Sequence, residues 1–299
     1  MVYTEIKEKN GRKYYYRAIS KREGKGVGKK RIYLGVDLNK SILSEKEANA
    51  DKELMLLSTL LTSEEKKEID RIKKEYLEIP KETRENRYES FISLFTYDST
   101  NIEGNTLTLR ETSQLLFEGV TPRKSLREIN EVVNHKTAFD YILKTKKDIS
   151  KEFIFKLHEL VINNTLKDEL KSQIGKYRTL QVYIRGVDWL PPKPEEVPKE
   201  MGSLLSWYAK NKKNINPLVL SAYFHSAFET IHPFVDGNGR VGRLLMNFIL
   251  HRNKLPMINI PNRKKHIYYL ALESSQTKGD LRPFVKFLFD LLKEEKVSF

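Results

Sequence analysis

Two strongly apolar helical patterns, separated by a short polar segment, constrain the fold of this 299-residue chain more than any other feature. The first is "NPLVLSAYFHSAFETI", in which Asn216 suits an N-cap and Pro217 the first helical position. The second opens near Gly239, and in both runs large apolar side chains recur at helical spacing. These side chains are Leu220, Phe224, Ala227, Phe228 and Ile231, then Val241, Leu244, Leu245, Phe248 and Ile249. The patterns predict two core helices of a mainly α-helical protein, with His225 in a structural position.

The composition excludes several classes of protein. The chain has no cysteine, which rules out disulfide frameworks, thiolate zinc sites and cysteine nucleophiles. Hydrophobic residues make up 39% of the chain and charged residues 31%, as in ordinary soluble globular proteins. The N-terminus has no signal-peptide core, and no apolar run approaches the roughly 18 residues that span a bilayer. We therefore expect a cytoplasmic protein that has no membrane partner.

The N-terminal segment is unusually basic. Residues 1–40 contain twelve Lys or Arg and four Asp or Glu, a net charge of +8 within a chain total of +14. Aromatic and β-branched residues alternate with charges in "RKYYYRAI" and "KKRIYLGV", which predicts a β-hairpin or a small antiparallel sheet. The segment is either a solvated, Lys-rich edge structure or a docking surface for nucleic acid or a partner protein. The residues suited to base stacking are Tyr14, Tyr15, Tyr16 and Tyr33.

The remaining chain is organised mainly by helical periodicity. Capping-box spacing marks two candidate helix starts: Ser44 with Glu47, and Thr62 with Glu65. The charged stretch "PKETRENRYES" reads as a linker. We expect a basic β-rich segment at 1–40, a helical region at 41–90 and a larger helical domain at 91–295.

One segment, "YRTLQVYIRGVDWLPPKPEEVP", interrupts the helices. Val182 and Ile184 alternate with polar neighbours, "RGVD" supplies a turn, and Pro191 with Pro192 ends the run, so we predict a β-hairpin. A lone hairpin is marginal in water and must pack on the helices. Its free strand edges would accept an extended peptide. The alternative is a simple connector between helices.

The polar segment between the two core helices is "HPFVDGNGRVGR", His232 to Arg243. Gly237 and Gly239 allow backbone N–H groups to approach a ligand just before a helix N-terminus, where the dipole favours anions. Asn238 adds an amide donor. Arg240 and Arg243 fall on the first turn, where cations are unfavourable unless an anion is present. The segment therefore predicts a phosphate site.

Two further residues of this segment indicate chemistry on a phosphate group. Asp236 would repel bound phosphates unless Mg²⁺ lay between them, and Mg²⁺ is usually held by one or two carboxylates plus phosphate oxygens. His232, with an unperturbed pKa near ~6.5, is suited to accept the proton of a hydroxyl. The combination predicts transfer of a phosphorus-containing group and is hard to explain as a polar turn alone.

The segment "HPFVDGNGRVGR" resembles the Fic family, whose motif HxFx(D/E)GNGRxxR it matches at every defined position. The similarity in character extends over about 93–293, and the predicted hairpin corresponds to the family's flap. The resemblance implies an α-helical domain that uses ATP and Mg²⁺ to transfer AMP to a Ser, Thr or Tyr hydroxyl of a protein, releasing pyrophosphate.

The resemblance also implies roles for individual residues. His232 would be the general base and Asp236 the Mg²⁺ ligand. The other roles follow by motif position. The anion hole would be Gly237, Asn238 and Gly239, with Arg240 and Arg243 on the β- and γ-phosphates. The flap residues that cover the nucleotide and pair with the target would be Val182, Tyr183, Ile184 and Arg185. The adenosine-contacting residues would be Tyr268, Tyr269 and Gln276, where relatives often have Asn in place of Gln276.

A second motif, "DSTNIEGN", contains Ser99, Glu103 and Gly104 in the spacing of the family's inhibitory pattern (S/T)xxxE(G/N). Ser99 and Glu103 are one helical turn apart, so both can face the same site. The resemblance implies an inhibitory helix near 93–104, in which Glu103 pairs with Arg243 and blocks the γ-phosphate site. Without the resemblance, the same residues would be an ordinary helix end with a Gly C-cap.

Several alternatives remain open on sequence grounds. In the family, such a glutamate can also orient a water that removes AMP from a modified target. A nucleic-acid-binding regulator, with the basic segment as reader and the Fic domain as nucleotide sensor, is the alternative of another class. The expected partners are ATP or another nucleotide, a hydroxyl-bearing target protein that can be the chain itself, and a second copy in a homodimer.

Overall fold

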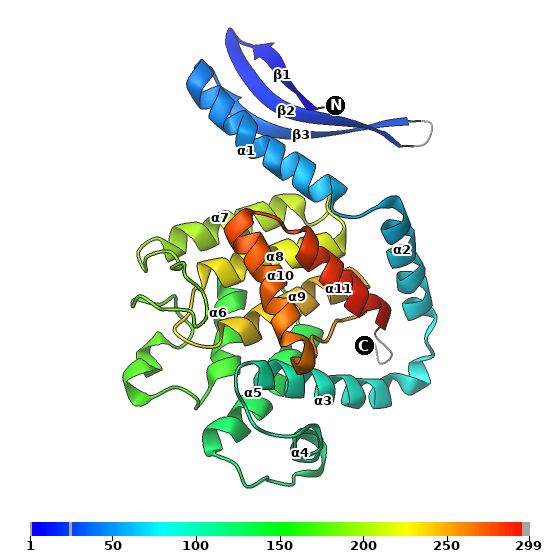
Figure 1. Ribbon diagram of the computed structural model, residues 1–299, viewed down its shortest axis with the longest axis vertical. Coiled ribbons are helices and arrows are strands. Elements are labelled where there is room, and N and C mark those ends of the chain that lie inside the picture. The colour runs from blue at the N-terminus through cyan, green and yellow to red at the C-terminus, as the bar shows by residue number, and fades with distance from the viewer. Residues whose placement is uncertain (1, 24–25, 295–299) are drawn as a thin grey trace. The chain divides into compact units, whose positions relative to one another are not determined.

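The computed structural model describes residues 2–23 and 26–294, and it is mainly helical with a small sheet at the N-terminus (Figure 1). The predicted fold class is confirmed. The backbone divides into two compact units, one ending at Thr62 and the other beginning at Ser63. Across the described residues, no helix is both long and apolar enough to cross a membrane.

The first unit is a three-stranded antiparallel sheet in the order β1-β2-β3, followed by helix α1. Its elements are β1 (Val2–Lys9), β2 (Arg12–Glu23), β3 (Gly26–Val36) and α1 (Lys40–Thr59). Asn10 and Gly11 both have positive φ and join β1 to β2, as an Asn-Gly pair does in a tight hairpin turn. The small sheet, one of the two expected forms, is therefore present.

Helix α1 begins earlier than expected. The predicted cap at Ser44 is wrong, because Asn39 is the N-cap and its side chain accepts a hydrogen bond of 2.9 Å from Ile42 N. Asn caps a helix as well as Ser does, so the earlier cap adds a full turn. Helix α2, in contrast, begins directly after Thr62, where the second start was expected.

The second unit consists of helices and connecting loops, and its described residues contain no strand. Its elements in chain order are α2 (Ser63–Glu78), η1 (Lys81–Thr83), α3 (Arg84–Ile102), α4 (Leu109–Ser113), η2 (Gln114–Glu118), α5 (Leu126–Lys144), α6 (Lys151–Ile162), η3 (Asp168–Gln173), α7 (Val197–Asn211), α8 (Pro217–Ile231), α9 (Asn238–Arg252), η4 (Asn262–Lys264), α10 (Lys265–Lys278) and α11 (Arg282–Glu294). Helices α8 and α9 are the two core helices predicted from the apolar patterns.

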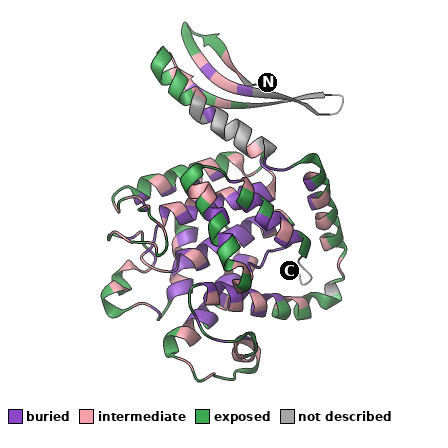
Figure 2. Cartoon of the chain, viewed as in Figure 1, coloured by how far each residue is buried: buried purple, intermediate pink, exposed green. Residues whose placement is uncertain are grey.

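Burial is concentrated on α8 and α9 in the middle of this unit (Figure 2). Every residue from 241 to 250 is buried. Asn216 caps α8 by accepting a 3.0 Å hydrogen bond from Leu218 N. Because both helices are held by a close-packed core, the loop that joins them has fixed ends.

The C-terminal end of α3 is also tied to the core. The buried Asp98 accepts hydrogen bonds from Asn259 Nδ2 at 2.6 Å and from Asn262 N at 2.7 Å. The segment that contains Asn259 is itself anchored to α9, because the Asn247 side chain bonds both N and O of Ile258. The last turn of α3 therefore has a fixed position beside α9.

The segment between η3 and α7 differs from the predicted hairpin. Residues 177–196, all of them described, contain no β-strand, and the chain reverses at a turn where Gly186 has a φ of +85°. Pro191 and Pro192 have no N–H, so the returning arm cannot donate a ladder hydrogen bond at these two positions. Their carbonyl groups instead accept from side chains: Gln181 Nε2 donates to Pro191 O, and Arg178 Nη2 donates to Pro192 O. We call residues 179–192 the flap.

Candidate active site

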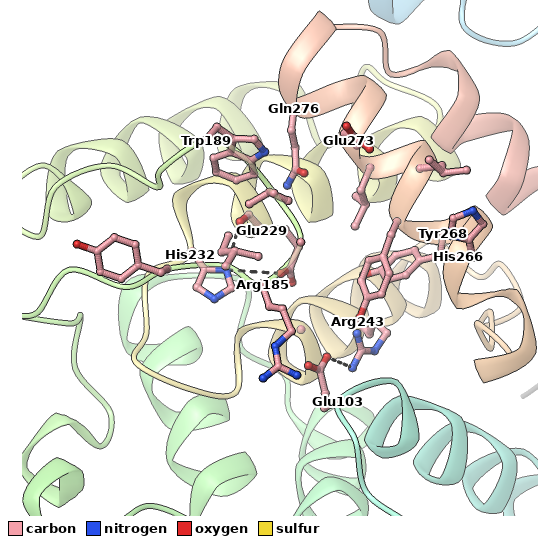
Figure 3. Close-up of a pocket in the computed structure, with 18 residues that line it drawn as sticks. Glu103, Arg185, Trp189, Glu229, His232, Arg243, His266, Tyr268, Glu273 and Gln276 are labelled. Carbon is pink, nitrogen blue, oxygen red and sulfur yellow. Dashed lines mark hydrogen bonds and ion pairs between the residues drawn. The ribbon is translucent and has the colours of Figure 1, made fainter.

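A cavity of about 570 Å³ lies between the end of α3, the α8–α9 loop, α10 and the flap (Figure 3). Ten of the residues expected at the site line it: Glu103, Tyr183, Ile184, Arg185, His232, Gly239, Arg243, Tyr268, Tyr269 and Gln276. Lining residues that sequence reasoning missed are Gly186, Val187, Trp189, Glu229, His266, Leu270, Leu272 and Glu273. The expected residues that do not line it are Ser99, Gly104, Val182, Asp236, Gly237, Asn238 and Arg240.

His232 ends α8 in a left-handed conformation, with a φ of +50°. This conformation is uncommon for a residue other than glycine and is held by the hydrogen bond from His232 N to Phe228 O. Burial lowers the pKa of His232 to about 4, so the ring is neutral at pH 7. Nδ1 lies 3.4 Å from Glu229 O, and a carbonyl can only accept, so Nδ1 carries the proton. Nε2 is thus left as the proton acceptor.

The loop after His232 is closed by Asn238. Its side chain accepts from Phe234 N at 2.9 Å and donates to Phe234 O at 2.8 Å, and the residue is buried. The Asn238 amide therefore shapes the loop, and its backbone N–H remains for a ligand. Gly237 has a φ of +82°, and a Cβ there would lie 2.8 Å from Ile162 Cγ2. Only glycine fits this position without strain.

Asp236 is held at the edge of the site. Its Oδ1 accepts from Gly237 N at 2.6 Å and from Arg240 Nη2 at 3.0 Å. Oδ2 accepts only from Arg127 Nη2 at 3.3 Å, and that arginine side chain is 57% exposed. No cluster of three or more His, Asp or Glu side chains among the described residues could hold a metal alone. A cation at Asp236 would thus need further oxygens from a ligand.

His158 of α6 contacts the loop between α8 and α9. Its Nδ1 accepts from Gly175 N at 3.1 Å, so Nε2 is the donor to Asp236 O at 3.1 Å. The ring stacks on Phe234 with centroids 3.7 Å apart. Burial lowers the pKa of His158 to about 4, so the ring is neutral at pH 7 and can keep this tautomer.

Arg240 is a buried guanidinium with unused donors. It forms ion pairs with Asp236 at 3.0 Å and with Glu131 at 3.6 Å. Its Nε and Nη1 have no hydrogen-bond acceptor among the described residues. Buried polar groups are usually satisfied, so these donors have room for a further acceptor, either a water or an anion.

Arg243 is 1% exposed and is bonded to the last turn of α3. Nε donates to Ser99 Oγ at 2.9 Å, while Nη2 donates to Ser99 O at 2.7 Å and to Glu103 Oε1 at 2.8 Å. A helix C-terminus favours a cation, and the Glu103 carboxylate adds to that attraction. Gly104, with a φ of +100°, ends the helix at this point.

The Glu103 carboxylate also lies against the first turn of α9. A Cβ built on Gly239 would be 2.1 Å from Glu103 Oε1 and 3.0 Å from Arg243 Nη1. This is the helix N-terminus at which the sequence predicted an anion. In the structure the anion beside it is the Glu103 carboxylate.

Glu229 is the most informative residue that sequence reasoning missed. It lies three residues before His232, and its Oε2 is 3.9 Å from His232 Nδ1. Its Oε1 is buried with no hydrogen-bond partner. Burial raises the pKa of Glu229 to about 8, so the carboxyl is mostly protonated at pH 7. A lone acidic residue in the otherwise apolar α8 pattern was the available signal.

Helix α10 supplies the opposite wall of the cavity. The Tyr268 hydroxyl lies 2.8 Å from His225 Nε2, and both side chains are buried, which gives His225 the predicted structural position. Tyr269 is 46% exposed. Gln276 lies two turns further along the helix and lines the same cavity (Figure 3).

Arg178 joins the flap to the α8–α9 loop, a role that no sequence pattern indicates. The side chain is buried, with Nε donating to His232 O at 2.8 Å and Nη1 to Leu180 O at 3.1 Å. Nη2 bonds Pro192 O, and Arg178 N bonds Pro233 O. One guanidinium thus holds both arms of the flap and the carbonyl of His232.

Comparison with known proteins finds relatives over the part of the chain that contains this site. The model of the Fic/DOC family matches residues 148–250, from the start of α6 into α9. The protein adenylyltransferase Fic of Nematostella vectensis is 36% identical over 198 residues, which are 64% of this chain and 45% of that protein. The chain thus spans less than half the length of the curated relatives it matches.

Solved structures share the fold. A Fic domain containing signalling protein from Bacteroides thetaiotaomicron superposes with a TM-score of 0.69 at 29% identity, covering 77% of this chain and 94% of that one. A Fic family protein from Desulfovibrio desulfuricans is 30% identical with a TM-score of 0.66, covering 78% of this chain and 73% of that one.

Proposed function

Because the chain belongs to the Fic/DOC family, we propose that it is a protein adenylyltransferase. It would move AMP from ATP to a Ser, Thr or Tyr hydroxyl of a target protein. The observation that carries this proposal is the neutral His232 in one cavity with Arg243 and the N-terminus of α9. A base and an anion site in the same cavity suit attack of a hydroxyl on a bound phosphate.

The proposed reaction needs one proton acceptor. The target oxygen forms a bond to the α-phosphorus of ATP while the bond from that phosphorus to the pyrophosphate oxygen breaks. The hydroxyl proton passes to His232 Nε2, which is the unprotonated ring nitrogen. Its lowered pKa makes His232 a weak base, but it also ensures that the ring is in the accepting form at pH 7.

The phosphates would lie at the start of α9. Backbone N–H groups of Asn238 and Gly239 lie at this end of the helix and favour an anion. The Gly237 N–H would join them once it leaves Asp236 Oδ1. Arg243 would hold the γ-phosphate once Glu103 leaves. The unused Nε and Nη1 donors of the buried Arg240 support its assignment to the β-phosphate.

Asp236 fits the requirement for Mg²⁺. It provides one partly exposed carboxylate, and its Oδ2 is bonded only to an exposed arginine that can move away. Mg²⁺ commonly takes one or two carboxylates and completes its shell with phosphate oxygens and water. When bound, the ion would neutralise charge on the phosphates and the pyrophosphate leaving group.

Helix α10 would hold the adenosine of ATP, and the flap would hold the target protein. Tyr268, Tyr269 and Gln276 line the cavity beyond the phosphates and would contact adenosine. In the flap, residues 182–185 would pair with the backbone of the target protein. Tyr183 is 77% exposed, so its ring is accessible to that partner.

We infer that the structure represents an inhibited state. Glu103 occupies one Arg243 donor and lies against Gly239, so a γ-phosphate must displace it. The Glu103 side chain is 36% exposed at the end of its helix, and it can therefore swing away without unfolding the core.

A pair of matched variants tests function and inhibition together. Glu103 and Glu273 are both exposed glutamates of the cavity, but only Glu103 contacts Arg243. With labelled ATP and Mg²⁺, Glu103→Ala should raise AMP incorporation, including self-modification, by on the order of tenfold or more. Glu273→Ala should not. His232→Ala added to Glu103→Ala should abolish incorporation, and unchanged incorporation would refute the role of the base.

The same site favours a second candidate, removal of AMP from a modified target. The observation behind it is that the Glu103 carboxylate is exposed to the cavity that contains His232, where it can orient a water. Release of AMP from a modified substrate by the unaltered chain, lost in Glu103→Ala, would identify this reaction. Comparing ATP, GTP, CTP and UTP as donors would fix the nucleotide in the forward direction.

A further inference from the structure

The small sheet of the first unit has two different faces. Helix α1 covers one face, where Tyr15, Leu34 and Ala50 form a buried cluster. Side chains alternate between faces along a strand, so Tyr14 and Tyr16 lie on the face opposite to Tyr15. The buried cluster that the described residues of this unit form does not include them.

Three tyrosines are adjacent on that second face. Tyr16 of β2 is paired with Tyr33 of β3, and their ring centroids are 5.3 Å apart. Tyr14 lies next along β2, with its ring 6.5 Å from that of Tyr33. Tyr33 is 52% exposed. We call Tyr14, Tyr16 and Tyr33 the tyrosine face.

One cation lies over the tyrosine face, and a second lies beside it in an ion pair with Glu5, which is opposite Tyr16 in the strand register. Lys7 of β1 places its Nζ 5.5 Å from the centre of the Tyr16 ring. Arg31, two residues before Tyr33 and so on the same face, forms a 2.6 Å ion pair with Glu5. In sequence, residues 1–40 carry twelve basic and four acidic groups, an excess that a polyanion would neutralise.

The alternative explanation is that the rings only stabilise the sheet. Aromatic cross-strand pairs contribute roughly 0.2–1 kcal/mol each, which is modest. Such pairing does not require an excess of cations around the rings, and it does not require half of the Tyr33 surface to be exposed. A ligand that stacks flat groups on rings and also carries negative charge accounts for both features.

We propose that the tyrosine face binds single-stranded nucleic acid. Unpaired bases would stack on Tyr14, Tyr16 and Tyr33, and Lys7 would contact phosphates, as in known stacking platforms. Single strands are favoured over duplexes because paired bases do not offer their faces. An acidic protein would use the cations but would leave the rings without a role. This surface belongs to the first unit, and the residues of the proposed transferase site belong to the second.

The test uses the full chain and fluorescein-labelled oligo-dT and oligo-U of about 20 nucleotides, long enough for one stacking platform. Anisotropy should show binding that weakens markedly between about 50 and 200 mM salt, because counterions are released. The triple variant Tyr14→Ser, Tyr16→Ser, Tyr33→Ser should lose about tenfold or more in affinity. Ile6→Ser is the matched control, since Ile6 is 54% exposed on β1.

Two further measurements make the outcome decisive. Circular dichroism of the triple variant shows whether the sheet persists, and if it does not, Tyr33→Ser alone replaces it. Equal oligonucleotide affinity of the unaltered chain and the folded variant would overturn the proposal. It would also be overturned if poly-glutamate bound as tightly as the oligonucleotides and its binding did not depend on the tyrosines. Because AMP transfer by Glu103→Ala should be unchanged by the tyrosine substitutions, failure here leaves the transferase proposal standing.

Discussion

Arg243 Nη2 of α9 lies 2.8 Å from Glu103 Oε1 of α3, although 140 residues separate the two in the sequence. Arg243 is almost completely buried, while Glu103 is partly exposed. The arginine therefore cannot leave the pair, but the glutamate can. Any anion that enters the site competes with Glu103 for a fixed guanidinium.

ATP binding should reveal this competition as a thermal shift. A ligand that binds the folded state stabilises it according to its affinity. With Mg²⁺ and saturating ATP, we expect a larger rise in Tm for Glu103→Ala than for the unaltered chain, because no carboxylate must be displaced. His232→Ala should keep the shift of the unaltered chain, since His232 acts on the hydroxyl. Equal shifts for Glu103→Ala and the unaltered chain would contradict the competition.

Ser99 should matter for stability more than for inhibition. Ser99→Ala leaves Arg243 Nε as a buried donor without its acceptor, at a cost of about 1–3 kcal/mol. The Glu103 contact remains, so AMP transfer should rise much less than in Glu103→Ala. Urea unfolding measures the first effect. Ser93→Ala is the control, because Ser93 is also buried on α3 but makes no contact with Arg243. The same loss in both variants would contradict the assignment.

Glu229 should make stability fall as the pH rises. Burial raises its pKa to about 8 from an ordinary value of 4.5, so the folded state binds the proton more tightly than the unfolded state. This contribution is fully present below about pH 4.5 and is lost as the pH rises to about 8. Glu229→Gln mimics the protonated form and should remove this part of the pH dependence in thermal unfolding. An unchanged slope would place the Glu229 pKa near its ordinary value.

Arg178 should control the flap and His232 together. The chain has two tryptophans, Trp189 in the flap and Trp207, which packs on Tyr223 with ring centroids 4.0 Å apart. In a Trp207→Phe background, Arg178→Lys should make Trp189 more accessible to acrylamide, because lysine cannot reach three carbonyls at once. The kcat for AMP transfer should fall while KM for ATP changes little.

A purely structural role for Arg178 would give a different result. Global unfolding of Arg178→Lys would raise the quenching of Trp189 and the loss of ATP binding in parallel. If quenching of Trp189 rises while ATP still shifts the Tm, the substitution loosens the flap without unfolding the protein. Unchanged quenching and unchanged kcat would show that the flap does not depend on Arg178.

The central part of the site could be predicted because its residues are close in sequence. His232, Gly237 and Arg243 lie within one loop and one helical turn, and apolar periodicity placed that loop between buried helices. The approach of Glu103 to Arg243 was expected only through the resemblance to a family. No local pattern specifies a contact across 140 residues.

The residues that sequence reasoning missed depend on burial and on backbone partners. Arg178 bonds only main-chain carbonyl groups, which any residue provides, so no partner residue marks it. Glu229 has a raised pKa because its carboxyl group is buried away from water, and burial cannot be read from the sequence alone. The flap was predicted as a hairpin from alternation, but Pro191 and Pro192 remove the donors that pairing requires.

The flap has a consequence for how a second chain would dock. Its two arms are tied at the base by Arg178 and Gln181, and among the described residues the backbone N–H groups of 182–185 have no acceptor. An incoming extended peptide would not have to break an existing ladder to align there. It would be the first strand that this segment pairs with, so the docked peptide would itself create the sheet and set its register.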